Sequence, residues 1–119
     1  MTYSLELSYR PETRVVLIGT TVCPKDEELL PALPQIATNI HHLRSLLTDS
    51  DAIDIPEESV IEIIDDEAGS IVDKIAEAAD DATDTLIIYC AGHGILGTDT
   101  CPLYLQLKTQ RMSVSTPTQ

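Results

Sequence analysis

The stretch Leu86-Ile-Ile-Tyr-Cys-Ala-Gly-His-Gly94 is a run of β-forming residues that stops at a histidine between two glycines. Such an apolar run is typical of a buried strand in a parallel sheet, and it would deliver one imidazole to the rim of that sheet. The flanking glycines let the backbone turn sharply and let another group approach closely, which a purely structural histidine would not require. His93 is therefore the first candidate for chemistry, and a turn that merely contains a histidine is the alternative.

The residues before this stretch predict an α/β fold. Apolar runs at 14–19 and 60–64 predict two earlier strands, and the first has the pattern of a central strand covered on both faces. Helical spacing of apolar residues predicts helices over 34–48 and 70–82, and a short run at 103–105 predicts a fourth strand. Strands alternating with helices are the signature of right-handed crossovers and a mainly parallel sheet flanked by helices.

This topology favours a functional role for His93. In open α/β sheets, sites lie beyond the carboxyl ends of the strands, where the strand order reverses. His93 follows the third predicted strand and the loop 20–33 follows the first, so both should lie at that edge of the sheet. Few residues follow the third strand to cover the far side of the sheet, and an uncovered apolar edge favours binding of a partner chain.

The length of 119 residues allows one domain. We expect an N-terminal arm or edge strand at 1–13, the α/β domain at 14–109 and a disordered tail at 110–119. Twenty acidic residues against seven basic ones give a formal net charge of -13, which opposes binding to nucleic acid or to an anionic membrane.

The cysteine count and the hydropathy pattern bear on localisation. The three cysteines are an odd number without paired spacing, which favours a reducing compartment over a disulfide framework. No stretch has the charge pattern of a signal peptide or the length of a membrane span, so we expect a cytoplasmic protein without an anchor.

Two cofactor motifs are disfavoured. The stretch Gly92-His-Gly-Ile-Leu-Gly97 has the glycine spacing of a dinucleotide fingerprint, but residues 98–102 do not begin the helix that would hold a pyrophosphate. Cys90, His93 and Cys101 are zinc-type ligands, but Cys90 lies inside the predicted strand and no fourth ligand has suitable spacing. We therefore expect no cofactor and no metal.

Other titratable residues have simpler interpretations. His41 and His42 are in the middle of the first helix, where one should face inward and one outward, in packing or surface roles. The region 49–84 holds fourteen acids against the single base Lys74. Such a charge run is typical of a solvated face, although it could also select a cationic partner.

A histidine at a strand end most often acts as a general base, and a thiol is the natural group for it to activate. Cys90 lies within the predicted strand, where a free cysteine behaves as an inert hydrophobe. Cys101 lies in the loop after the histidine, and Cys23 lies in the loop after the first strand. No position requires any of the three to be the nucleophile.

Four segments of the chain together resemble the N-terminal half of bacterial caspase-like domains (peptidase C14, metacaspase-related). They are Arg14-Val-Val-Leu-Ile-Gly19, Leu33-Pro34 with Asn39 and Leu43, the run from Asp84 to Gly94, and Leu103-Tyr-Leu105. The resemblance covers about 14–109, and its most specific part is Tyr89-Cys-Ala-Gly-His-Gly94. It implies a caspase-like three-layer sandwich, of which only the N-terminal half is present, and a cysteine endopeptidase that acts on peptide or protein substrates.

The resemblance also implies roles for two residues. His93 matches the catalytic histidine, and Gly94 matches the residue whose backbone N–H helps to form the oxyanion hole. The family's nucleophile is a cysteine at the end of the next core strand, in an Asp-Cys-Cys or Gln-Ala-Cys type of sequence, and this sequence stops before that strand. We therefore expect this chain by itself to be inactive as a peptidase.

Three explanations of this departure stay open. In the first, the chain is the histidine-bearing part of a peptidase whose cysteine is supplied by another segment. In the second, it is a non-catalytic interaction module that binds a caspase-like partner, or a second copy of itself, through its open sheet edge. In the third and weakest, Cys101 or Cys23 serves as a substitute nucleophile.

Overall fold

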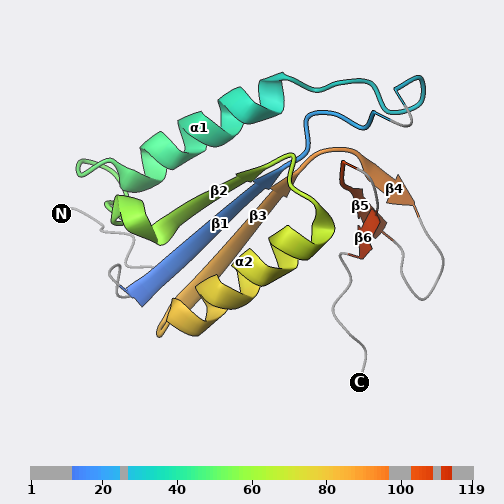
Figure 1. Ribbon diagram of the computed structural model, residues 1–119. Helices are drawn as coiled ribbons and strands as arrows, with labels where there is room; N and C mark the ends of the chain where they lie inside the picture. The colour runs from blue at the N-terminus through green and yellow to red at the C-terminus, as the bar shows by residue number, and fades with distance from the viewer. Residues whose placement is uncertain (1–11, 25–26, 97–102, 109–110, 114–119) are drawn as a thin grey trace.

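A three-stranded parallel sheet with a helix on each face is the main body of the protein (Figure 1). The computed structural model describes residues 12–24, 27–96, 103–108 and 111–113. The sheet has the order β2-β1-β3, and its strands are β1 (Thr13–Gly19), β2 (Val60–Ile64) and β3 (Thr85–Ala91). Its covering helices are α1 (Gln35–Thr48) and α2 (Ala68–Asp81). The prediction of an α/β fold with a parallel sheet flanked by helices is confirmed.

β1 is the central strand of the sheet, and its side chains are buried on both faces. The core between the sheet and α2 contains Val16, Ile18, Ile63, Ile71, Ala78 and Leu107. The core between the sheet and α1 contains Val15, Leu17, Ile36, Ile40, Ile55 and Val60. The alternation along β1 divides its side chains between these two cores, which is why a continuous apolar run forms this strand.

β3 forms at the predicted residues, but it is an edge strand. It pairs with β1 on one side, and no strand in the described part of the chain pairs with its other side. Ile88 and Tyr89 are 45% and 40% exposed, and Cys90 is exposed too. The expectation that this run, Cys90 included, is buried is therefore wrong. The reason is that α1 packs mainly over β1 and β2 and α2 packs mainly over β1, so both faces of β3 are covered less than those of the central strand.

The C-terminal residues form a second sheet that the apolar pattern does not predict. Its strands are antiparallel in the order β4-β5-β6, with bounds β4 (Gly94–Leu96), β5 (Leu103–Gln106) and β6 (Arg111–Ser113). The predicted strand at 103–105 therefore exists but does not join the parallel sheet. Part of the expected disordered tail is a strand, because backbone pairing to β5 needs no apolar run. Residues 1–11 of the arm and 114–119 of the tail lie outside the described residues.

The connection between α1 and β2 contains a short 3-10 helix, η2 (Glu57–Ser59). Both long helices begin within two residues of the predicted positions, α1 directly after Pro34 and α2 two residues before Ser70. Neither these helices nor any other in the described ranges is long and apolar enough to cross a membrane.

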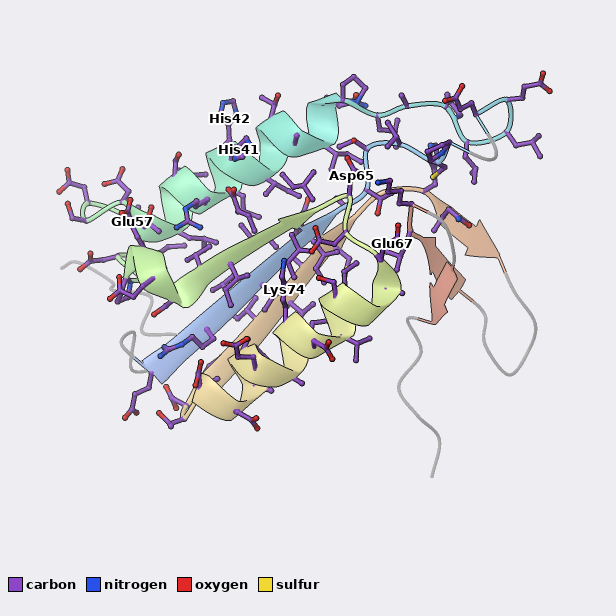
Figure 2. All side chains as sticks on the ribbon, in the orientation of Figure 1. His41, His42, Glu57, Asp65, Glu67 and Lys74 are labelled. Carbon is purple, nitrogen blue, oxygen red and sulfur yellow. The ribbon has the colours of Figure 1, made fainter. Side chains whose placement is uncertain are left out.

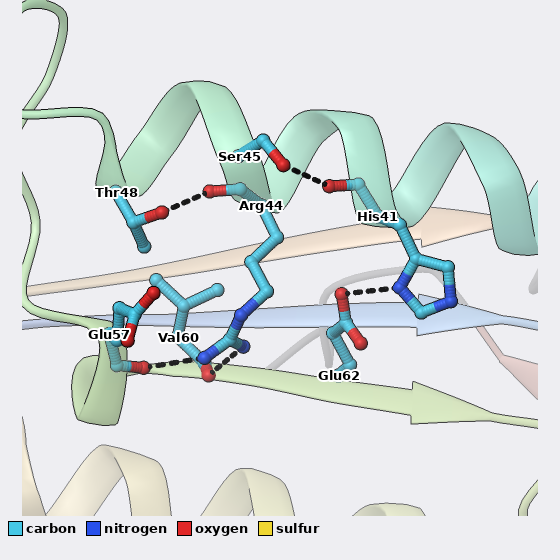
Figure 3. Close-up of polar contacts among 7 residues, drawn as sticks. All are labelled: His41, Arg44, Ser45, Thr48, Glu57, Val60 and Glu62. Carbon is cyan, nitrogen blue, oxygen red and sulfur yellow. Dashed lines mark hydrogen bonds and ion pairs between the residues drawn. The ribbon is translucent and has the colours of Figure 1, made fainter.

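Polar contacts from α1 close the outer side of β2 (Figure 3). The Arg44 guanidinium donates hydrogen bonds to the carbonyl oxygens of Val60 (2.6 Å) and Glu57 (2.9 Å). His41 Nδ1 lies 3.0 Å from Glu62 Oε1 on β2. Both His41 and His42 are exposed, so the expectation that one faces inward is wrong; their neighbours Ile40 and Leu43 occupy the core-facing positions instead.

One ion pair on α2 makes the stability depend on pH. Lys74 Nζ lies 2.7 Å from Asp66 Oδ2 in the segment that joins β2 to α2 (Figure 2). Hydrogen bonds from Lys74 and, to a smaller extent, Ser70 hold the pKa of the Asp66 carboxyl below its ordinary value of 3.8. A carboxyl with a depressed pKa stabilises the folded state above its unfolded pKa, and that contribution is lost as the pH falls through the folded pKa.

Lys74→Met should therefore lower the free energy of unfolding at pH 7 by less than about 1 kcal/mol, because the pair is partly exposed and screened by solvent. The difference between the variant and the wild type should shrink as the pH falls below 3.8. Urea unfolding of both proteins at pH 7 and at about pH 2.5 measures this. A difference of the same size at both pH values would contradict the assignment.

Candidate active site

The carboxyl edge of the parallel sheet gathers the segments that follow its three strands. The N–H of Thr20, directly after β1, donates to the carbonyl oxygen of Ala91 at the end of β3 (3.1 Å). The N–H of Asp65, directly after β2, donates to the carbonyl oxygen of Gly19 (2.9 Å). His93 and the loop 20–33 both lie at this edge, as the topology predicted.

Asp65 fixes the first turn of that loop. Its carboxylate accepts hydrogen bonds from the backbone N–H of Thr21 (2.7 Å), from the Thr21 hydroxyl and from the N–H of Val22 (3.4 Å). Asp65 has a φ of 59°, in the left-handed region that aspartate tolerates better than most residues. This conformation starts the turn that aims the carboxylate back across the end of β1.

The loop returns to the same edge and contacts the histidine. The N–H of Leu33 donates to the carbonyl oxygen of Thr21 (2.7 Å), which closes the loop on itself. Pro31, two residues before Leu33, places its carbonyl oxygen 2.8 Å from His93 Nε2. A carbonyl oxygen can only accept, so His93 Nε2 carries the hydrogen in this contact. In the neutral imidazole, Nδ1 is then the unprotonated nitrogen and can act as a base.

The backbone groups of His93 and Gly94 point to opposite sides of the chain. Gly92 has a φ of 156°, and His93 is half-buried. The carbonyl oxygen of His93 accepts a hydrogen bond from the N–H of Gln106 on β5 (2.9 Å). The carbonyl of His93 and the N–H of Gly94 belong to one trans peptide group and point in opposite directions, so the N–H of Gly94 points away from β5. No described strand pairs with β4 on that side.

Neither of the two described cysteines is set up as an activated nucleophile. Cys23 is 4% exposed, and its Sγ contacts the carbonyl oxygen of Leu107 (3.8 Å). Desolvation raises the pKa of the Cys90 thiol, which lowers the fraction of reactive thiolate. Cys101, the third candidate, lies outside the described residues.

The described residues also bear on the two cofactor motifs. Residues 94–96 form a strand, which does not offer the helix N-terminus on which a pyrophosphate rests. Within the described ranges, no three His, Cys, Asp or Glu side chains come together as a metal site.

Sequence reasoning singled out His93 and Gly94 but missed Asp65 and Pro31. Asp65 had one usable signal, since it directly follows a predicted strand of a parallel sheet. That signal was hidden in a row of three acids, of which the first is hydrogen-bonded to the loop after β1. Pro31 contacts the histidine through its backbone carbonyl oxygen. Every residue has such a group, so the amino-acid type gives no signal of this role.

Asp65→Ala should lower the free energy of unfolding by about 1–3 kcal/mol, because it leaves the partly buried donors of Thr21 and Val22 without their acceptor. Asp54→Ala is the matched control, since Asp54 has nearly the same backbone conformation (φ 61°) and no described side-chain hydrogen bond. Its cost should be below about 1 kcal/mol, the ordinary effect of a surface substitution. Denaturant unfolding of both variants measures the difference, and equal costs would refute the role given to the carboxylate.

Comparison of the chain with models of protein families gave no match, and comparisons with curated proteins and with solved structures gave none either.

Proposed function

We propose that this chain is the histidine-bearing half of a caspase-like cysteine peptidase, in which a second segment supplies the nucleophilic cysteine. The observation that carries the proposal is the contact between His93 Nε2 and the Pro31 carbonyl oxygen at 2.8 Å. It orients the ring and leaves Nδ1 as the proton acceptor. The N–H of Gly94 is next in the chain and is directed away from the β4–β5 pairing.

These groups suit acyl transfer from a peptide to a thiol. His93 Nδ1 takes the thiol proton, and the sulfur attacks the peptide carbonyl carbon. The Gly94 N–H donates to the oxyanion of the tetrahedral intermediate, a contact typically worth about 3 kcal/mol of barrier. The imidazolium then gives its proton to the leaving amine, and water hydrolyses the acyl-enzyme in the second half of the reaction. The Pro31 carbonyl stabilises the imidazolium through Nε2–H.

The open side of β3 supports the delivery of the thiol from a further strand. A strand added parallel to β3 would end at the same edge of the sheet as β3 itself, beside His93. A cysteine at the end of such a strand would therefore face the base. If the thiol comes from such an added strand, neither Cys23 nor Cys90 needs to be activated by His93.

A non-catalytic interaction module is the second candidate function. The exposure of Ile88, Tyr89 and Cys90 favours it, because they lie on a strand whose outer side pairs with no other strand of the described residues, and sheet edges of this kind bind extended chains. The two candidates differ in one outcome, since only the first predicts chemistry that depends on His93.

Hydrolysis of a fluorogenic peptide library by the protein isolated in its native assembly tests the proposal. We expect hydrolysis that stops after alkylation with iodoacetamide and persists in the presence of a chelator, because a thiolate and no metal performs the attack. Complete absence of hydrolysis, or hydrolysis that survives alkylation, would overturn the peptidase proposal.

A further inference from the structure

Large apolar side chains are exposed unevenly around the parallel sheet. On the two helices and β3 they are Leu46 (58%), Val72 (55%), Ile88 (45%) and Tyr89 (40%). Burial of these side chains by a partner would be favourable, because it removes apolar surface from water. All four residues lie around the β3 edge of the sheet. The cations Arg44 of α1 and Lys74 of α2 are directed to the opposite, β2 side.

On α2, Val72 and Lys74 lie on opposite flanks. The two positions are separated by about 200° around the helix, while Ile71 and Ala78 between them face the core. Lys74 reaches the segment that leaves β2 (Figure 2). Because α2 packs over the central strand β1, the opposite flank with Val72 lies on the side of β3.

The same division occurs on α1. Arg44 reaches the carbonyl oxygens of Val60 and Glu57 on the side of β2 (Figure 3). Leu46 is again separated by about 200° from that cation, so it lies on the flank turned away from β2. Both helices therefore turn a polar flank to β2 and an apolar side chain to the opposite side.

β3 presents apolar side chains on both faces of the sheet. Ile88 is in register with Val16, whose side chain packs towards α2. Tyr89 is in register with Leu17, whose side chain packs towards α1. We call the apolar surface around the open edge, made by Leu46, Val72, Ile88 and Tyr89, the β3 flank.

The charges are divided in the same way. Arg44 and Lys74 are the cations of α1 and α2, and both are directed to the β2 side, while the sequence of β3 contains no charged residue. Of the exposed acids of α2, Asp80 and Asp73 lie about 80° and 100° from Val72 around the helix, whereas Glu77 lies on the flank of Lys74. The whole chain carries a formal net charge of -13.

We infer that the β3 flank is the docking surface for a positively charged polypeptide that adds a strand to β3 and has apolar side chains on both faces of that strand. The main-chain groups of β3 provide the pairing, and the four side chains cover both faces of the incoming strand. Charge complementarity selects a cationic segment and disfavours a second copy of this chain, since each copy carries -13. The inference rests on the proposed function in one respect, that a segment completes the sheet beside β3.

Two synthetic peptides test the inference on the full chain. The probe is Lys-Lys-Val-Thr-Ile-Val-Ile-Lys-Lys, and its match has glutamate in place of every lysine. We expect the lysine peptide to shift the amide resonances of 88–90 and to bind at least ten times more tightly than the glutamate peptide. Raising the salt concentration should reduce that ratio, because exposed charges are screened.

Ile88→Lys should weaken binding of the lysine peptide at least ten-fold. Leu29→Lys is the matched control, because Leu29 is 79% exposed and lies in the loop after β1, outside the β3 flank. It makes the same change of net charge and should leave binding unchanged. Val72→Lys provides a second test if circular dichroism shows that Ile88→Lys does not fold.

Equal binding of the two peptides, or shifts confined to residues away from β3, would overturn the inference. Self-association of the chain that Ile88→Lys abolishes would show a second copy as the occupant and would also overturn it. His93→Ala should bind the peptide as the wild type does. Peptide binding without hydrolysis would refute the peptidase alone, and hydrolysis without peptide binding would refute the docking surface alone.

Discussion

Replacing His93 with alanine is expected to lower kcat/KM for peptide hydrolysis by the native assembly by a factor of about 10²–10⁴, the usual contribution of a positioned general base. The thiol would lose its proton acceptor, and the leaving amine would lose its proton donor. The Pro31 carbonyl that orients the ring at 2.8 Å would have no partner. The loss should fall mainly on kcat, because the imidazole acts on groups that change in the transition state.

His42→Ala is the control for this measurement. His42 is an exposed residue of α1 with no described contact to the candidate site, so its removal makes the same change of residue type without the chemistry. Steady-state kinetics of both variants with one fluorogenic peptide would compare them. Hydrolysis that is equal in His93→Ala and the wild type would remove His93 from the mechanism.

Gly19→Ala is expected to lower the free energy of unfolding by about 1–3 kcal/mol, the typical cost of adding a methyl group to a filled core. Gly19 ends β1 directly beneath α1, and a Cβ there would collide with Ile40 Cδ1 and would lie 2.9 Å from Ile36 Cγ2. Both isoleucines are buried, Ile40 completely. The two isoleucine side chains must therefore repack or α1 must shift, and either change loosens the packing between the helix and β1.

Gly69→Ala is the matched control because a Cβ at that position in α2 meets no atom within 4 Å. Alanine is a better helix former than glycine, so this variant should be more stable by up to about 1 kcal/mol. Thermal and urea unfolding of the two variants should give opposite signs. A Gly19→Ala protein as stable as the wild type would show that α1 does not pack on β1 as closely as described.

The sequence predicted the parallel sheet well because its strands are formed by local apolar runs. β1 is buried on both faces, and its unbroken run of aliphatic residues reflects that. β3 has an equally apolar run, so the same rule predicted a buried strand. β3 is exposed because it stands at the edge of the sheet. Whether a strand is central or at the edge depends on its neighbours, and its own apolar run does not show this.

The second sheet and half of the candidate site escaped prediction for different reasons. β4 and β6 have three residues each, too few for a period of two to be recognised. The His93 position was predicted from a strand that ends in glycine. Its orientation depends on a backbone carbonyl 62 positions earlier in the chain, brought close only by the fold. Asp65 was obscured because it stands in a row of acids that have unrelated contacts.

The most direct test of the central claim is covalent labelling of the native assembly with a peptidyl chloromethyl ketone, followed by denaturation and intact-mass measurement of each chain. The claim predicts that the label is attached to a cysteine other than the three of this 119-residue sequence, and that His93→Ala prevents the labelling. A label on Cys23, Cys90 or Cys101, or no label on any chain, would contradict it.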